Sequence, residues 1–186
     1  NDYVGKGLSG ATIILKPFSH LAMDASKSTI IGNTCLYGAT SGYLYAAGQA
    51  AERFAVRNSG ATAVIEGCGS NGCEYMTGGK VAILGEVGDN FGAGMTGGMA
   101  FLYDPSNRFE KVVNPDSIGW NRIQSAHWES VLKEMVTSHY ERTGSRRAMT
   151  ILDQWEVELP HFWQIVPHEV KSRLEHPLSD DAAVVA

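Results

Sequence analysis

The sequence predicts an all-β solenoid, a parallel β-helix, followed by a C-terminal α-helical tail. Three observations support this prediction. A glycine-containing segment recurs at intervals of about 19 residues, each copy precedes a short apolar run, and residue usage changes near residue 104. Such a repeat is too short for paired helices, but it suits a coil built from short strands and tight corners.

The five recurring segments end at residues 11, 42, 60, 79 and 98, so the intervals are 31, 18, 19 and 19 residues. Each is followed by a strand-like run, at 13–15, 43–45, 64–65, 81–84 and 100–103. We expect these runs to stack as neighbouring strands of one parallel sheet. The corner before them would then hold Gly42, Gly60, Gly79 and Gly98 in register.

Sharp corners explain why glycine recurs, because it adopts positive φ and allows close backbone approach without a Cβ clash. A small polar residue precedes or lies near each corner and can hydrogen-bond the local backbone; these residues are Ser9, Thr40, Asn58, Thr77 and Thr96. The long first interval predicts a loop at 16–27 that bulges out of one coil. The chain starts without Met and almost directly in a repeat, so we expect it to belong to a longer polypeptide.

Residue usage predicts two parts, a β-helix at 1–104 and a connector with a helical tail at 105–186. The first part holds 19 of the 21 glycines, whereas the second holds all four tryptophans and five of the six histidines. Glycine-rich, charge-poor repeats are typical of a stacked solenoid. The second part requires a different kind of packing.

In the tail, residues 105–119 read as a connector, and apolar spacing predicts a helix at about 124–142 that ends at Gly144. A second helix is expected at 145–155, an extended segment at 161–166, a short helix at 167–174 and a frayed end from Pro177. Helices this short require a surface to pack on. We therefore expect the tail to cover the solenoid or a neighbouring domain and to bury its tryptophans, which are Trp120, Trp128, Trp155 and Trp163.

Composition excludes several classes of function. The formal net charge of −5 does not favour nucleic acid, and no apolar run is long enough to span a membrane. No secretory signal is recognisable, and three cysteines form no disulfide framework. We expect Cys35, Cys68 and Cys73 to be reduced and to be buried as small apolar side chains. We also expect the protein to be cytoplasmic.

Three segments match G-x-G-x-x-G, at 5–10, 67–72 and 92–97. A dinucleotide site requires a helix after this motif, whereas here a strand pattern follows, so we interpret all three as solenoid corners. Among the acidic residues, Glu66 and Glu86 could lie in adjacent coils as the acid and base of a polysaccharide-cleaving enzyme. The simpler interpretation is that the solenoid's acidic residues, Asp104 included, are solvated at corners. The histidines show no metal spacing and read as solvated or capping residues.

Several long strings resemble the C-terminal domain of the glutamate synthase large (α) subunit. The resemblance covers about residues 1–176, including parts of the tail at 143–145 and 151–155. It implies that the chain begins inside the family's domain and lacks the first coils. The strings that carry it are residues 1–10, 31–40, 52–60, 72–79 and 90–98.

This resemblance implies a right-handed parallel β-helix, the GXGXG domain, at the end of an enzyme that makes two glutamates from glutamine and 2-oxoglutarate. In that family an amidotransferase domain releases ammonia, and a barrel with FMN and a 3Fe–4S cluster completes the reductive step. The family's cluster pattern, C-x5-C-x4-C, has only one matching interval here, between Cys68 and Cys73. The sequence therefore assigns no catalytic, cofactor-binding or metal residue to this chain.

The implied role is a rigid interdomain scaffold whose partners are the other domains of the large subunit. A small electron-donating subunit or ferredoxin would supply electrons, and the sequence does not choose between NADPH and ferredoxin. Two alternatives stay open at this stage. One is the β-helix subunit of formylmethanofuran dehydrogenase, and the other is a free-standing β-helix enzyme acting on polysaccharide.

Overall fold

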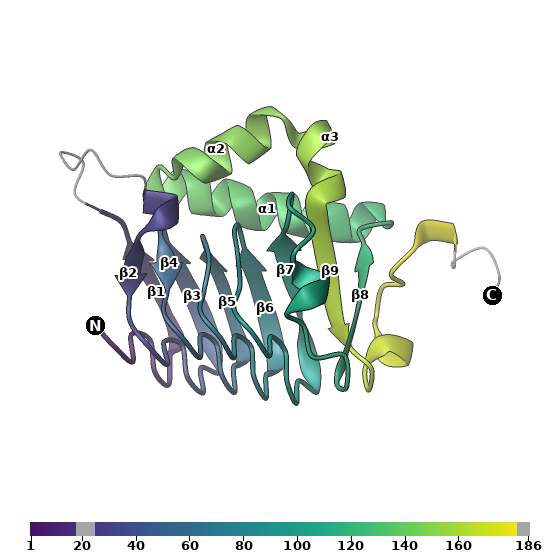
Figure 1. Ribbon diagram of the computed structural model, residues 1–186, viewed down its shortest axis with the longest axis horizontal. Coiled ribbons are helices and arrows are strands. Elements are labelled where there is room, and N and C mark those ends of the chain that lie inside the picture. The colour runs from purple at the N-terminus through teal and green to yellow at the C-terminus, as the bar shows by residue number, and fades with distance from the viewer. Residues whose placement is uncertain (18–24, 182–186) are drawn as a thin grey trace.

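The computed structural model describes residues 1–17 and 25–181, and it shows a row of stacked coils with helices along one side (Figure 1). Most of the loop predicted at 16–27 lies outside the described residues. The long side of the coils is a sheet of five parallel strands in sequence order: β1 (Ser9–Leu15), β3 (Ser41–Ala46), β5 (Ser59–Ile65), β6 (Thr77–Ile83) and β7 (Gly97–Tyr103). The predicted β-solenoid is confirmed.

A narrower second side is formed by β2 (Thr29–Ile31) and β4 (Gln49–Ala50), which also pair in parallel. Single parallel bridges continue this side, from Ala50 to Cys68 and from Cys68 to Val87. A short 3-10 turn, Ala25–Lys27, leads into β2. Each coil thus alternates a long strand with a short extended piece.

The third side is an arc in which every second residue has positive φ. The first and third of these residues donate their N–H to the next coil, as Arg53 does to Ser70 O, and the middle one donates to the preceding coil, as Ala55 does to Cys35 O. Stacked backbones thus satisfy one another on both sides of each arc. The positive-φ residues are Tyr3, Gly5 and Gly7; Thr34, Leu36 and Gly38; Arg53, Ala55 and Arg57; Asn71, Cys73 and Tyr75; Asn90, Gly92 and Gly94.

The corner before each long strand agrees with the prediction at three positions and differs at one. Gly42, Gly79 and Gly98 have φ of +100°, +85° and +79°. Gly60 does not have a left-handed φ. A Cβ at this position would point toward Thr40 O rather than toward the corner glycines of the neighbouring coils. Ala61 lies under Gly79, and the Asn58 side chain bonds both the N–H and the carbonyl of Ala61, at 2.9 Å each. Asparagine hydrogen bonds thus stabilise the corner where the third coil lacks a left-handed glycine.

The interior of the coils is filled by small and aliphatic side chains with a few aromatic rings. Phe54 and Phe91 are fully buried, and the three free cysteines are buried as predicted. The last coil is closed by the chain after β7. There a 3-10 turn, Phe109–Lys111, places Phe109 edge-on to Phe91, with ring centroids 5.9 Å apart.

Two strands of the tail extend the long sheet beyond β7. β9 (Phe162–Pro167) runs antiparallel to β7, and β8 (Ile118–Arg122) runs antiparallel to β9. The extended segment predicted at 161–166 is confirmed. The helix predicted at 167–174 is wrong, because β9 pairs through Pro167 and only a 3-10 turn, Lys171–Arg173, follows.

The helices lie along the carboxyl ends of the parallel strands (Figure 1), where they cover that half of the sheet's outer face. α1 (Ala126–Thr143) ends at Gly144 with φ +70°, as predicted. The second predicted helix is divided at Gln154 into α2 (Arg146–Asp153) and α3 (Trp155–Glu158), and a 3-10 turn, Leu159–His161, leads into β9. A second apolar cluster joins Val64 and Phe101 of the sheet to Leu132 of α1 and Ile151 of α2.

Two tail predictions require correction. Trp128 and Trp155 are buried, whereas Trp120 and Trp163, on β8 and β9, are only partly buried. The end of the chain is docked rather than frayed up to the last described residue, because Trp128 Nε1 donates to Pro177 O and Ala126 N donates to Asp180 Oδ2.

We expect Gly79→Val to lower the free energy of unfolding by about 1–3 kcal/mol, because valine is strained at positive φ and its Cβ would collide with backbone. That Cβ would lie 2.3 Å from Ala61 O. Lys80→Val is the matched control, since Lys80 is exposed on β6. Chemical denaturation measures both variants, and equal midpoints would contradict the corner assignment.

Candidate functional site at the junction of solenoid and tail

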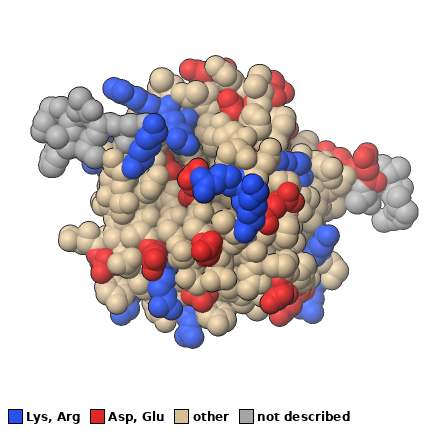
Figure 2. Space-filling model, in the orientation of Figure 1, with Lys and Arg blue, Asp and Glu red and all other residues tan. Residues whose placement is uncertain are grey.

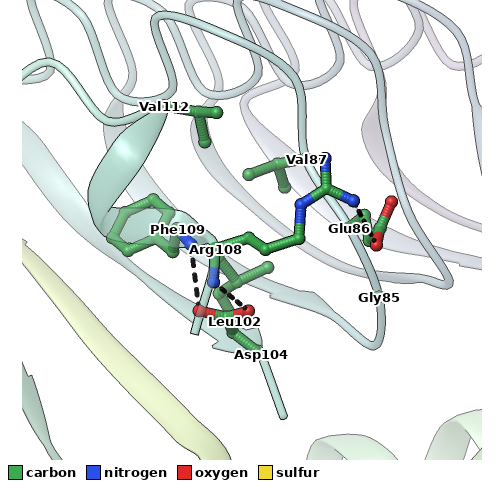
Figure 3. Close-up of a pocket in the computed structure, with 8 residues that line it drawn as sticks. All are labelled: Gly85, Glu86, Val87, Leu102, Asp104, Arg108, Phe109 and Val112. Carbon is green, nitrogen blue, oxygen red and sulfur yellow. Dashed lines mark hydrogen bonds and ion pairs between the residues drawn. The ribbon is translucent and has the colours of Figure 1, made fainter. Parts of the chain in front are cut away.

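Two adjoining hollows lie where the ends of β5, β6 and β7 meet the beginning of α2. They share Gly85, Glu86 and Asp104. The larger has a volume of about 420 Å³ and is lined by Ser26, Lys27, Gln49, Glu66, Gly85, Glu86, Tyr103, Asp104, Pro105, Ser106 and Arg147. The smaller is drawn in Figure 3 and is lined by Gly85, Glu86, Val87, Leu102, Asp104, Arg108, Phe109 and Val112.

Glu66 follows β5 and is 2% exposed. Its Oε1 accepts a hydrogen bond from Ser145 Oγ, and His139 Nε2 lies 3.4 Å from the same oxygen. Ser145 is the N-cap of α2, where its Oγ accepts from Ala148 N at 3.0 Å. One carboxylate therefore ties the end of a solenoid strand to both α1 and α2.

These contacts correct two predictions. Glu66 is not a solvated corner residue, and His139 is fully buried rather than solvated or capping. Burying a carboxylate is unfavourable unless hydrogen bonds compensate, and here two tail side chains lie within reach of it. Sequence reasoning missed the cluster because Ser145 is 79 residues from Glu66.

The cluster contains serine, histidine and glutamate without the geometry of a nucleophilic triad. Ser145 Oγ and His139 Nε2 both approach Glu66, and the structure shows no hydrogen bond between them among the described residues. Among the described residues His139 Nδ1 has no hydrogen-bond partner, and Nε2 is the ring nitrogen that faces the carboxylate. The three side chains are at most 4% exposed, and of the three only Glu66 lines the hollow, so the arrangement is placed to act as an anchor.

Asp104 forms a second anchor and is likewise not a solvated corner residue, since it is 6% exposed. Its Oδ1 accepts from Arg108 N at 3.0 Å, and its Oδ2 accepts from Phe109 N at 3.0 Å and Trp163 Nε1 at 3.1 Å. Figure 3 shows the two backbone contacts. The Asp-Pro dipeptide is a sequence signal for such a turn.

Burial alone would raise the pKa of Asp104. The hydrogen bonds from Phe109 N, Arg108 N, Trp163 and Ser106 outweigh it and hold that pKa below the ordinary value of 3.8. The carboxylate is therefore charged at neutral pH, where it joins the closing turn of the solenoid to β9.

Glu86 lies at the mouth of the hollows and pairs with Arg108 at 3.0 Å, with both side chains largely exposed. Figure 2 shows acidic and basic side chains next to one another near the centre of this face, in agreement with such pairing. Glu66 and Glu86 are thus engaged separately, and they do not form the acid–base pair of a polysaccharide-cleaving enzyme. Arg147 is engaged as well, through Leu84 O and Ser26 Oγ.

The cysteines are placed for packing rather than for reactivity. Burial raises the pKa of Cys68 to about 12 and, with the proximity of Cys68, raises that of Cys73 well above its ordinary value. Thiols in this state are poor nucleophiles and poor metal ligands. Within residues 1–17 and 25–181, no group of three or more His, Cys, Asp or Glu is arranged to hold a metal ion. The three G-x-G-x-x-G segments precede β1, β6 and β7, as expected for solenoid corners.

The GXGXG motif family model matches residues 1–168. This chain belongs to the GXGXG family. The "Glutamate synthase [NADPH] large chain" of Azospirillum brasilense is 57% identical over 186 residues, which is 100% of this chain and 12% of that protein. The "Ferredoxin-dependent glutamate synthase" of Cyanidium caldarium is 50% identical over 90% of this chain and 11% of its own length. A chloroplastic/mitochondrial ferredoxin-dependent form from Arabidopsis thaliana is 50% identical over 90% of this chain and 10% of its own length.

These matches confirm the resemblance to the glutamate synthase large subunit. The chain spans about a tenth of the length of these curated relatives. The formylmethanofuran dehydrogenase and polysaccharide alternatives receive no support. Among the described residues, no helix has the length and apolar character that a membrane crossing requires.

Removing the Glu66 carboxylate should destabilise the chain. Glu66→Ala leaves Ser145 and His139 buried without their acceptor, at a cost of about 1–3 kcal/mol. Glu86→Ala is the matched control and should cost less than about 1 kcal/mol, because its ion pair is exposed. Urea midpoints test this, and an equal loss in the two variants would refute the anchoring role.

Asp104 should contribute stability that depends on pH. Because its pKa is lowered in the folded state, its contribution is complete near neutral pH and is lost as pH falls below 3.8 through the folded value. Asp104→Asn should therefore be less stable than the parent at neutral pH, and the difference should shrink in acid. The exposed Asp116→Asn variant is the control. A difference between Asp104→Asn and the parent that is constant across the acid range would contradict this assignment.

Proposed function

We propose that this chain is the GXGXG segment of a glutamate synthase large chain and acts there as a rigid scaffold between domains. The observation that carries the proposal is the 57% identity with an NADPH-dependent large chain over the complete sequence. The junction supports the scaffold role, because its buried polar groups join solenoid and tail instead of presenting themselves to a substrate.

The complete enzyme would make two glutamates from glutamine and 2-oxoglutarate by reductive amidotransfer. The amidotransferase, the FMN site and the 3Fe–4S cluster would lie elsewhere in the polypeptide, and this segment would contribute no catalytic or cofactor-binding residue. Its partners would be the neighbouring domains, which it holds at a fixed separation so that ammonia passes between them. Electrons would come from a small NADPH-dependent subunit or from ferredoxin, and a cytoplasmic location is part of the proposal.

The division into a solenoid at 1–104 and a connector with tail at 105–186 is also proposed. Within the described residues, β1 pairs only with β3, so its other edge presents unpaired backbone groups. Natural proteins rarely leave such an edge open. We propose that a further coil of the same polypeptide covers it.

Two measurements test the function. The purified 186-residue chain should show no flavin absorbance, no iron and no glutaminase activity, and any of the three would overturn the non-catalytic assignment. In the complete enzyme, Gly79→Val should keep glutamine hydrolysis but release more ammonia per glutamate formed, whereas Lys80→Val should not. Unchanged coupling in an enzyme whose solenoid has demonstrably loosened would refute the scaffold role.

A further inference from the structure

The last described residues cross the beginning of α1 as a strap, defined here as residues 176–181. Trp128 Nε1 donates to Pro177 O at 3.0 Å. Ala126 N donates to Asp180 Oδ2 at 2.9 Å, and Asp180 N donates to Gln124 O at 3.2 Å. The strap lies beyond residue 168, where the match to the GXGXG family ends.

Asp180 supplies the cap that α1 lacks locally. The N-cap residue Ser125 makes no side-chain hydrogen bond to the helix backbone. A carboxylate at a helix N-terminus satisfies a free N–H and interacts favourably with the helix dipole. The hydrogen bonds from Ala126 N and Ser125 hold the pKa of Asp180 below its ordinary value of 3.8, so this cap is ionised at any pH above about 5.

Two stacked imidazole rings also join the strap to the beginning of α1. The rings of His127, in the first turn of α1, and His176, on the strap, stack with centroids 3.6 Å apart and planes 21° apart. Trp128 meets the His127 ring edge-on at 4.7 Å. Stacked neutral rings attract, and a single proton on the pair is compatible with stacking against a neutral partner.

We propose that the strap is a pH-operated latch: it is closed over the beginning of α1 when the His127–His176 pair carries at most one proton, and it opens when both rings are protonated. Two cations at this separation repel each other, and water screens the repulsion only in part because His176 is half-buried. The positive end of the helix dipole, next to His127, adds to the cost. Histidine is the side chain that changes charge between about pH 5 and 8, and this is therefore the range over which the latch is tested.

Of the other charged groups on the elements that meet at the stack, two carboxylates already accept hydrogen bonds. Glu129 of α1 accepts from Trp155 Nε1 at 2.9 Å, and Asp180 caps the helix. The remaining charges on this part of the chain have mixed signs and lie on Lys171, Arg173, Glu175 and Asp181. Because Asp180 stays ionised in mild acid, a loss of docking there would come from the histidines.

Opening would uncover two features now covered by the strap. The first turn of α1 would lose its carboxylate cap, and the Trp128 indole N–H would lose its acceptor. Trp128 is only 7% exposed and belongs to the cluster that joins α1 to the sheet. An open strap would therefore present an uncapped helix end beside an aromatic side chain, while the stacked coils stay intact.

Hydrogen–deuterium exchange of the complete polypeptide that carries this segment tests the latch. Peptides that contain the Ala126 and Asp180 amides report docking directly. After correction for intrinsic exchange, their protection should fall about tenfold between about pH 7.5 and pH 5, whereas peptides from β5 and β6 should keep theirs. Constant protection at Ala126 and Asp180 would overturn the proposal.

His176→Phe keeps an aromatic ring on the strap and removes its proton. Its protection should fall less than that of the parent over the same range, and an equal or larger fall would overturn the proposal. His168→Phe is the matched control, because the His168 ring contacts Pro115 O away from the strap, and it should retain the full fall. Loss of the pH response in His168→Phe would equally refute the assignment to the stacked pair.

Discussion

The fold depends on one constraint: each coil must satisfy the backbone hydrogen bonds of the coils on either side. In the long sheet this is ordinary parallel pairing. In the arc it requires left-handed backbone at alternate residues, so that successive N–H groups point to opposite neighbours. Stacking and corner conformation are therefore inseparable, because a residue that leaves positive φ breaks hydrogen bonds in an adjacent coil as well as in its own.

This constraint explains why the arc tolerates residues other than glycine. Leu36, Ala55 and Cys73 hold the middle left-handed position in the second, third and fourth coils, and all three are fully buried. Left-handed backbone is unfavourable for each of them. It is held by their own N–H bonds to the preceding coil and by the bonds of the flanking left-handed residues to the next coil. Glycine returns in the outer coils, at Gly5 and Gly92.

The features that the sequence predicts are those that repeat along the chain or depend on neighbouring residues. The strand period and the end of α1 at Gly144 follow from short-range spacing, and the burial of the cysteines follows from their residue type. Contacts between distant residues leave no such pattern. No sequence pattern near Glu66 predicts that His139, 73 residues later, lies beside it. Likewise, no pattern near Ala126 predicts that the helix is capped by a residue 54 positions away. The arc was also hidden, since non-glycine residues occupy many of its left-handed positions.

The contacts at the junction indicate that specific side chains fix the orientation of the tail on the solenoid, in addition to its stability. An apolar side chain at residue 66 would avoid the desolvation of a carboxylate, and buried polar clusters often contribute less to stability than well-packed apolar ones. A carboxylate with two tail partners, however, is satisfied in one arrangement of α1 and α2, whereas apolar contacts accept several. Asp104, which lines both hollows, has the same kind of role, because its carboxylate joins the closing turn at Phe109 to Trp163 of β9. The proposed scaffold role requires this kind of directional contact, because a stable tail in a variable position would not hold a neighbouring domain in place.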